Sequence, residues 1–338
     1  MKRFFQLDTD ESRRSLMSRA RQVALLALQK YDVNWEHIHY NQLSDTITFK
    51  IEAEDDECFL MRIHSDMMTQ EEILSEVMVL NALSPCVDFS IPEGIASRDG
   101  SYVLEIHTEQ GYHNPSVTLM RWVNGELASG KLTDSRVFNI GIMTAKLHEA
   151  SMRFVPPTGF TRPTWGEDSF RCDMTKLGQY YNVFLSDEAW KSYQAAADKI
   201  ISELGVMHQT NENYGFIHSD LHIGNLVFNG DEVSPIDFGR CGYGYFLYDV
   251  AGAILGLYPQ QRVLFIQGYE SARKLQEHYV SHLECFFVMF MIENYCTHCS
   301  DPRETAGLIA EQPYAQAIIR AYLNGEPFLF NPIPLIDI

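Results

Sequence analysis

The stretch at residues 216–228 brings together the residue types that phosphoryl transfer needs. Asp220 and Asn225 lie in a polar loop between two short apolar runs that read as strands, and Asp237 follows in Asp-Phe-Gly. One carboxylate can meet an attacking hydroxyl, while an Asn and a second Asp hold the metal ions that bridge nucleotide phosphates. Amide and carboxylate oxygens are hard donors, which suit Mg²⁺. The spacing therefore predicts Asp220 as the catalytic base, and Asn225 and Asp237 as Mg²⁺ ligands.

An alternative interpretation is a strand-turn-strand hairpin whose Asp and Asn residues merely cap turns. Asp-Phe-Gly alone is a weak signal, and so is a lone His-x-Asp. Their order, the spacing from Asp220 to Asn225 and the apolar runs on both sides together favour the kinase interpretation.

Three motifs carry a resemblance to a known family: His218-Ser219-Asp220-Leu221-His222-x-Gly224-Asn225, Ile236-Asp237-Phe238-Gly239 and Tyr248-Asp249-Val250-Ala251. They are similar to motifs of the aminoglycoside phosphotransferase/choline kinase family, which has a protein-kinase-like fold. His222 and Gly224, in place of the Lys and Glu of protein kinases, favour the small-molecule branch. The resemblance implies that Asp249 braces the catalytic loop without taking part in the chemistry, and that His218 orders the loop backbone.

The elements that must position these residues fall into a β-rich part followed by a helical part. Hydrophobic periodicity predicts helices at 8–31 and 69–83, and strands at 47–51, 58–63, 91–96, 102–106 and 116–123. Residues 158–176 read as a loop that resembles the family's insert near the acceptor site. The remaining predicted helices cover 134–151, 186–204, 260–272, 275–299 and 303–323. We expect an α+β, two-lobed protein-kinase-like fold, with a β-rich nucleotide-binding N-lobe at 1–123 and a mainly helical C-lobe at 124–338.

Arg62 and Glu76 are the predicted pair on the nucleotide side. Arg62 lies where the third strand of the kinase fold carries its phosphate-binding Lys, and an Arg can hold phosphate oxygens through a bidentate fork. Glu76 falls on the apolar stripe of the helix at 69–83, where a carboxylate needs a partner. Arg62 is the natural one, as in the Lys–Glu pair of kinases. The alternatives are a surface Arg on the strand and a Glu that reaches solvent from the stripe's edge.

Two further segments are candidates for the nucleotide site. No glycine precedes Gly94, so a Gly-rich phosphate loop is absent and residues 41–46 become the candidate covering loop, with Ser44, Asp45 and Thr46 as donors. The end of the strand at 116–123, with residues 124–126 that follow it, resembles the family's hinge. There the backbone of Arg121 and Val123 would meet the adenine edge, with Met120 beside it; the alternative is a plain edge strand and turn.

Composition limits the partners. A formal net charge of −19 argues against a general nucleic-acid surface and is compatible both with cationic substrates and with simple solubility. Acidic residues follow the basic start where a signal peptide would be apolar, and the longest apolar run, at 285–292, is too short to span a bilayer. We expect a cytoplasmic protein without nucleic-acid or membrane partners.

The predicted activity is transfer of the γ-phosphoryl group of ATP or GTP, with Mg²⁺, to a hydroxyl of a small molecule. The acceptor is an aminoglycoside-like cation or a metabolic alcohol such as homoserine, choline or a sugar. Two alternatives stay open: a bacterial Ser/Thr protein kinase of the same superfamily, and a catalytically silent scaffold. Acceptor identity, the choice between ATP and GTP, and oligomeric state are not determined by the sequence, because acceptor pockets are built from variable loops.

Overall fold

The computed structural model describes residues 2–5, 10–44, 46–108 and 111–336, which divide into two compact units. The first unit holds the described residues up to Asn124 together with Phe154–Arg162, and the second holds Gly125–Arg153 and the described residues from Pro163 onward. Residues 154–162 thus group with the first unit although they lie in the predicted C-lobe range. Hydrogen bonds from their backbone and side chains to the helix at residues 70–83 account for this grouping.

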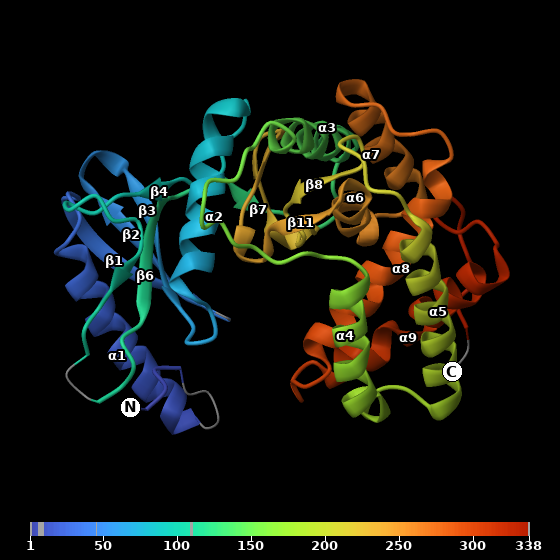
Figure 1. Cartoon of the computed structure of the whole chain (residues 1–338), viewed down its shortest axis with the longest axis horizontal. Coiled ribbons are helices and arrows are strands. Elements are labelled where there is room, and N and C mark those ends of the chain that lie inside the picture. Colours follow the sequence, from blue (N-terminus) through green and yellow to red (C-terminus); the bar gives the residue numbers. More distant parts are fainter. Residues whose placement is uncertain (1, 6–9, 45, 109–110, 337–338) are drawn as a thin grey trace. The chain divides into compact units, whose positions relative to one another are not determined.

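The first unit is built on an antiparallel sheet in the order Trp35–Leu43 (β1), Thr46–Ala53 (β2), Cys58–His64 (β3), Ser116–Arg121 (β6) and Gly94–Ile95 (β4), and Leu104–Glu105 (β5) also pairs with β6 (Figure 1). The predicted strands at 47–51 and 58–63 are confirmed, with an acidic 3₁₀ turn at Glu54–Asp56 between them. The elements are α1 (Asp10–Leu28), β1 (Trp35–Leu43), β2 (Thr46–Ala53), β3 (Cys58–His64), α2 (Gln70–Leu83), a 3₁₀ turn (Ser84–Cys86), β4 (Gly94–Ile95), β5 (Leu104–Glu105) and β6 (Ser116–Arg121).

The two faces of this sheet carry different side chains. Because side chains alternate along a strand, Met61 and Ile63 of β3 point into the apolar core while Arg62 points to the other face. The core side is covered by the apolar stripe of α1, which packs on alternate residues of β2, β3 and β6. Arg62 instead meets α2 through Glu76. The alternation of side chains along β3 therefore places the Arg62 guanidinium on the face of the sheet that α2 covers.

Helix α2 begins as the sequence predicts. The Thr69 side chain accepts from the Glu72 N–H, and the Glu72 carboxylate accepts from the Thr69 N–H, which completes a capping box. Ile73, Val77 and Leu80 are buried, as the stripe predicts.

Three predictions in this unit are wrong in detail. A further strand, β1, is absent from the prediction, because all of its side chains are exposed or half-buried and no apolar alternation marks it. Residues 41–46 are not a loop, since Asn41 to Leu43 belong to β1 and Thr46 begins β2, which leaves a tight hairpin turn. Asp45 lies outside the described residues. The strands expected at 91–96 and 102–106 shorten to the two-residue strands β4 and β5.

The second unit is mainly helical, with three small antiparallel pairings of strands. The helix predicted at 134–151 is present with the predicted bounds, and those predicted at 186–204, 260–272, 275–299 and 303–323 are present with ends shifted by one to four residues. The elements are β7 (Glu126–Leu127), α3 (Asp134–Ser151), α4 (Glu167–Tyr180), α5 (Asp187–Val206), β8 (Tyr214–Ile217), β9 (Leu226–Asn229), β10 (Glu232–Pro235), β11 (Gly242–Tyr245), α6 (Phe246–Leu255), α7 (Pro259–Ala272), α8 (Tyr279–His298) and α9 (Thr305–Asn324). Together the two units confirm the α+β class.

Helix α8 forms the centre of this unit and packs on α4, α5, α6 and α9. It is buried around most of its circumference, as its long apolar run predicts. Helices α3 and α7 cross very closely, because a Cβ atom on Gly141 would lie 2.1 Å from the Phe265 carbonyl oxygen and one on Gly268 would lie 2.0 Å from that of Phe138. Within the described residues, no helix is long and apolar enough to cross a membrane.

Helix α4 corrects the prediction of a loop at 158–176. The turn-forming residues that suggested a loop end at Gly166, which serves as the N-cap and pairs with Ser169. Phe170 and Leu177 then form a buried stripe two turns long. The helix lies against α8, and this contact brings residues of the predicted acceptor region close to the C-terminal helices.

Candidate active site

The catalytic loop leaves β8 at Ile217 and is held by one buried carboxylate. Asp249 of α6 accepts the N–H of His218 (2.8 Å) and the N–H of Ser219 (2.7 Å) on its two oxygens. These bonds hold Ser219 in the left-handed region, at φ 61°, a conformation that is costly for a residue other than glycine. The loop is therefore fixed one residue before Asp220.

A relay of buried side chains supports Asp249 in turn. His148 Nε2 lies 3.2 Å from Asp249 Oδ2, and His148 Nδ1 lies 2.9 Å from the Tyr269 hydroxyl. Burial lowers the pKa of His148, while its hydrogen bond to Asp249 acts in the opposite direction. Because a carboxylate only accepts, the neutral ring carries its proton on Nε2 and accepts from Tyr269. The close crossing of α3 and α7 brings His148 and Tyr269 together, and these contacts give His148 a structural role.

Asp220, Asn225 and Asp237 belong to two loops that are tied together. Asn225 Nδ2 donates to the Asp220 carboxylate (3.1 Å) and to the Asp220 carbonyl oxygen (3.0 Å). The Ile236 N–H donates to the Asn225 carbonyl oxygen (2.9 Å), which places Asp237 next to the loop. With its nitrogen turned to Asp220, the Asn225 amide has its oxygen left for a cation. Asp237 is exposed and left-handed, at φ 61°.

His218 forms hydrogen bonds to both of these loops. Its Nε2 donates to the Ile236 carbonyl oxygen (3.0 Å), its Nδ1 accepts the Asp220 N–H (3.3 Å), and its ring packs on Phe238 with the centroids 4.3 Å apart. This is the backbone-ordering role that the resemblance implies. His222 Nε2 lies 3.8 Å from Asp220 Oδ1, and burial is the main cause that lowers the pKa of His222.

The ion pair predicted in the first unit is present. Arg62 Nη1 contacts Glu76 Oε1, and both side chains are buried, at 5% and 0% exposure. The alternatives of a surface Arg and a solvent-reaching Glu are therefore wrong. His64, two residues along β3, is buried as well and donates to or accepts from Thr118 Oγ1 (3.0 Å). Burial, and then the charges of Arg62 and Arg162, keep the pKa of His64 low, so the ring is neutral.

The other residues proposed to contact the nucleotide are largely buried or already hydrogen-bonded within the chain. Met120 and Val123 are buried, and the Arg121 N–H already donates to the Glu93 carbonyl oxygen (2.8 Å). Any contact of Arg121 with a base therefore rests on its carbonyl oxygen. The Ser44 N–H donates to the Thr46 carbonyl oxygen (3.0 Å) and closes the β1–β2 hairpin, which leaves the Ser44 hydroxyl as the donor.

Glu293 of α8 is a buried carboxylate that the sequence analysis did not propose as a site residue. It directly follows the apolar run at 285–292. A signal was available, because a carboxylate that continues a fully buried helix needs a partner. Its side chain is 2% exposed, accepts from the Tyr248 hydroxyl through Oε2, and has no partner on Oε1.

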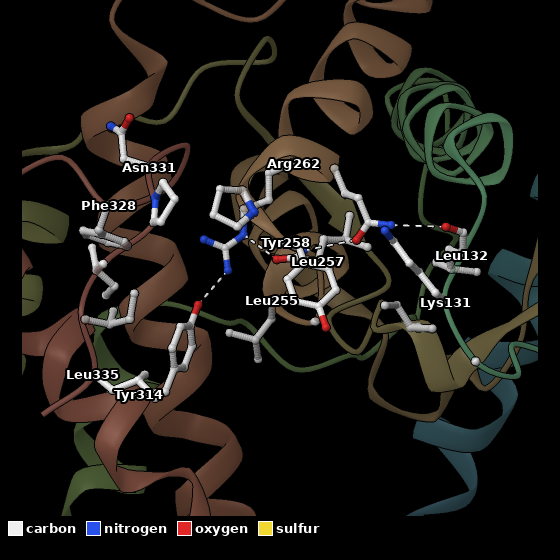
Figure 2. Close-up of a pocket in the computed structure, with 18 residues that line it drawn as sticks. Lys131, Leu132, Leu255, Leu257, Tyr258, Arg262, Tyr314, Phe328, Asn331 and Leu335 are labelled. Carbon is white, nitrogen blue, oxygen red and sulfur yellow. Dashed lines mark hydrogen bonds between the residues drawn. The ribbon is translucent and has the colours of Figure 1, made fainter. Parts of the chain in front are cut away.

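A cavity of about 610 Å³ lies elsewhere in the second unit, against α7, α9 and the C-terminal segment (Figure 2). Ile223 is its link to the catalytic loop. Figure 2 shows Arg262 at its centre, bonded to Tyr314 (2.7 Å) and to the Leu257 carbonyl oxygen (2.9 Å). Its described lining contains no carboxylate, and its charged residues are Lys131 and Arg262. The cavity therefore does not suit a cationic acceptor.

Comparison with known proteins assigns the family. A model of the phosphotransferase enzyme family matches residues 41–282, which is well over half of the chain and includes the Arg62–Glu76 pair, the catalytic loop and Asp-Phe-Gly. The chain belongs to this family. The assignment confirms the resemblance that the three motifs carry.

Two relatives of the phosphotransferase match much of the chain. A Synechocystis sp. protein, sll1119, described as uncharacterized, is 28% identical over 240 residues, which are 69% of this chain and 64% of that protein. The match thus spans less than two thirds of that relative. Amicoumacin kinase of Bacillus subtilis is 22% identical over 272 residues, which are 77% of this chain and 74% of that protein.

Solved structures of kinases share the fold. The microcompartment-associated aminopropanol kinase is 25% identical with a TM-score of 0.74, covering 91% of this chain and 98% of that one. Amicoumacin kinase hAmiN, in complex with AMP-PNP and Ca²⁺, is 16% identical with a TM-score of 0.75, covering 93% of this chain and 96% of that one. The protein-kinase-like fold expected from the motifs is confirmed.

Proposed function

We propose that this protein transfers the γ-phosphoryl group of ATP or GTP to a hydroxyl group of a small molecule. The observation that carries the proposal is the joined pair of loops, in which Asn225 orients the Asp220 carboxylate and Asp237 follows beside it. Membership of a phosphotransferase family supplies the reaction class. ATP and GTP are made and used in the cytoplasm, where the proposal places the enzyme.

In the first unit, the Arg62–Glu76 pair is the proposed holder of the nucleotide phosphates. A guanidinium fixed by a buried carboxylate keeps its remaining N–H groups in one orientation, so less entropy is lost when phosphate oxygens bind. Ser44, Met120, Arg121 and Val123 complete the proposed nucleotide site. That a structurally similar kinase was solved with AMP-PNP supports a nucleoside triphosphate as the donor.

Mg²⁺ is the proposed metal, and the donor set fits it. Asn225 offers an amide oxygen and Asp237 an exposed carboxylate, and oxygen ligands of this kind, completed by water and phosphate, are what Mg²⁺ takes in kinases. Bound Mg²⁺ would neutralise charge on the phosphate oxygens. The Asn225 nitrogen faces Asp220, which fixes the amide so that its oxygen is the atom offered.

Asp220 accepts the proton in the proposed transfer step. The acceptor oxygen forms a bond to the γ-phosphorus as the bond from that phosphorus to the bridging oxygen breaks, and the hydroxyl proton passes to the Asp220 carboxylate. The products are a phosphate monoester and a nucleoside diphosphate. Asp249 and His148 keep the loop in place during the step and do not exchange a proton with the acceptor.

The acceptor is proposed to be a small hydroxylated molecule that carries a cationic group. The names of the kinases that share this fold include aminopropanol kinase, and an aminopropanol is an amino alcohol. The region expected to bind the acceptor, formed by residues of α4 and the C-terminal helices, carries the buried carboxylate Glu293. A protein kinase or a silent scaffold is not favoured by any contact in the described structure.

Asp220→Asn tests the proposal. Asn keeps the size of the side chain and its bond to Asn225 but cannot accept a proton, so phosphoryl transfer should fall by about 10²–10⁴-fold while Mg²⁺–nucleotide binding is retained. Asp231→Asn is the matched control, since Asp231 lies in the β9–β10 turn and bonds Ser135 Oγ (2.9 Å). Rates measured with a panel of alcohols, and with water as acceptor, give the readout. Equal rates for the parent and Asp220→Asn would favour the scaffold.

A further inference from the structure

The cavity against α7, α9 and the C-terminal segment has a charge opposite to that of the whole chain. The chain carries a formal net charge of −19. The described lining of this cavity of about 610 Å³ nevertheless holds Lys131 and Arg262 and neither Asp nor Glu. Helix α7 begins at the cavity with no acidic residue in its first turn, so the positive end of the helix adds to the same field. The cavity therefore favours an anionic ligand.

Arg262 is a buried cation that pairs with no carboxylate among the described residues. The side chain is 2% exposed. Its hydrogen bonds all go to neutral oxygens, because Nε donates to the Leu257 carbonyl (2.9 Å), Nη1 to the Leu329 carbonyl (3.0 Å) and Nη2 to the Tyr314 hydroxyl (2.7 Å). A buried charge is costly unless a counter-charge lies beside it. A carboxylate group on a ligand would supply that counter-charge.

The Arg262 guanidinium also keeps donors for a ligand. It has five N–H groups, and the three hydrogen bonds leave one N–H on Nη1 and one on Nη2. The Phe287 ring of α8 covers one face of the guanidinium, with its centroid 4.6 Å away, so a further partner must approach along the edge. Donors on two neighbouring nitrogens suit the two oxygens of a carboxylate.

The rest of the lining is mainly apolar. Tyr258 and Leu335 line the cavity and are 65% and 63% exposed, so they form its rim, whereas Ile318 and Phe328 are buried inside it. Lys131 is exposed as well, and Figure 2 shows it on the other side of Tyr258 from the Arg262 guanidinium. A cavity of this size and composition suits a small organic molecule with an apolar body.

The cavity is distinct from the residues proposed for phosphoryl transfer. Its described lining contains none of Asp220, Asn225 and Asp237. Ile223, which belongs to the same 3₁₀ turn as Asn225, is the lining residue from the catalytic loop. A Cβ atom on Gly256 would lie 3.1 Å from Ile223 Cδ1, so this side chain packs against the end of α6. A ligand in the cavity would therefore touch the catalytic loop without occupying the site of transfer.

We propose that this cavity is a binding site for a small organic carboxylate with an apolar body. Arg262 binds the carboxylate oxygens through its two remaining N–H groups, and Lys131 attracts the negative charge at the rim. The apolar body packs between the exposed Tyr258 ring and the buried Phe328 ring. This site is additional to the nucleotide and acceptor sites of the proposed kinase and does not depend on them.

The test measures binding of octanoate and of 4-phenylbutanoate by isothermal titration calorimetry, with the primary amide of each acid as its neutral counterpart. The parent should bind the carboxylates with a Kd below about 1 mM, and at least tenfold more tightly than the amides, because the amides lack the charge. The titration is repeated with saturating Mg²⁺–AMP-PNP. Binding should persist, since the cavity lies apart from the residues proposed to hold phosphates.

Lys131→Glu is the variant that should leave the fold intact, because it changes an exposed side chain at the rim. It should weaken carboxylate binding by roughly tenfold and leave amide binding unchanged. Lys191→Glu is the matched control, since Lys191 is exposed on α5 outside the lining and its replacement alters the net charge equally. Arg262→Gln should weaken carboxylate binding by roughly 10–100-fold. If Arg262→Gln is poorly folded, Lys131→Glu and the comparison of acid with amide decide the matter.

Three results would overturn the carboxylate site. The first is an acid that binds no more tightly than its amide. The second is carboxylate affinity that Lys131→Glu changes no more than Lys191→Glu does. The third is loss of carboxylate binding in saturating Mg²⁺–AMP-PNP, which would place the probe in the nucleotide site. None of these results bears on whether the protein transfers a phosphoryl group, which the Asp220→Asn experiment tests separately.

Discussion

Each unit of the molecule buries a glutamate, and the two glutamates differ in what stands against them. In the first unit, Glu76 of α2 faces Arg62, and the two opposite charges are in contact. In the second unit, Glu293 of α8 receives only the Tyr248 hydroxyl, while the nearby Arg240 lies on the Trp165 ring. Glu76 also has one oxygen without a partner, so the difference lies in the counter-ion and not in the number of hydrogen bonds.

The difference indicates two kinds of site. A buried carboxylate matched by a guanidinium is complete within the chain, so it can hold Arg62 ready for a ligand that carries negative charge. A buried carboxyl with no counter-ion stays mostly protonated at neutral pH, as the raised pKa of Glu293 indicates, and it ionises when a ligand supplies the positive charge. The first arrangement suits the phosphates of a nucleotide, and the second suits the amine of an acceptor.

The largest effect is expected when the matched pair is broken. Glu76→Ala should lower the free energy of unfolding by about 3–5 kcal/mol, because it removes the carboxylate from a buried ion pair. Chemical denaturation with a matched surface control, Glu71→Ala on the exposed side of α2, measures the difference. A loss under 1 kcal/mol would show that Arg62 finds another partner and that the pair is not a unit.

Replacing both partners sharpens the comparison. The double variant Arg62→Met, Glu76→Leu should recover most of the stability that Glu76→Ala loses, since apolar residues of similar volume often replace a buried ion pair at little cost. Its nucleotide KM should nevertheless rise at least as much as that of Arg62→Met alone. Recovery of nucleotide binding together with stability would mean that the pair serves the fold only.

Replacing Glu293 should raise stability, whereas replacing Glu76 lowers it, and the gain should depend on pH. The pKa of its carboxyl rises from 4.5 to about 8 on folding, so the folded state binds more protons in that window and the stability of the parent falls as pH increases from about 4.5 to about 8. Glu293→Gln removes this loss and should be more stable than the parent at pH 8 by about 1–3 kcal/mol, and by less at pH 5. The difference between the two proteins cancels the opposite contribution of His148. A Glu293→Gln protein that is less stable than the parent at pH 8 would show that the chain itself satisfies the charge.

The smallest effect concerns the helix that carries Glu76. Thr69→Ala removes the capping box of α2 and should cost about 1 kcal/mol of stability. The Arg62–Glu76 contact lies two turns away and should keep the nucleotide KM within twofold. Thermal denaturation and steady-state kinetics measure the two quantities. A rise in KM of tenfold or more would show that α2 must be capped for the pair to form.

The sequence predicted the structure correctly where local sequence patterns and tertiary contacts favour the same arrangement. Thr69 and Glu72 form the capping box that begins α2, and the apolar stripe of α2 faces the core. Glu76 lies on that stripe and therefore needs a cation, which Arg62 of β3 provides. The catalytic loop could be predicted from the order and spacing of the three motifs. The side chains that hold it, Asp249, His218 and Asn225, occupy fixed positions within those motifs. All of these interactions can be written as patterns within one strand or helix and its neighbour.

The rest failed where no local pattern exists. Strand β1 has no buried face and therefore no alternation, and α4 was hidden by the turn residues that precede Gly166. Glu293 was missed because its importance depends on residues far away in the chain, Asp173 and Arg240, that helix packing brings close. Residues 154–162 belong to the first unit because they form hydrogen bonds to α2, and no sequence motif predicts these bonds.

One kinetic experiment tests the central claim that the two buried glutamates serve different substrates. Steady-state rates are measured for the parent, Glu76→Gln and Glu293→Gln while Mg²⁺–ATP and the best amino alcohol are varied independently. We expect a crossed result, in which Glu76→Gln raises mainly the KM of the nucleotide and Glu293→Gln raises mainly the KM of the amino alcohol, each by roughly tenfold or more. If both variants raised the same KM, or if each lowered kcat alone, the assignment of one glutamate to each substrate would be contradicted.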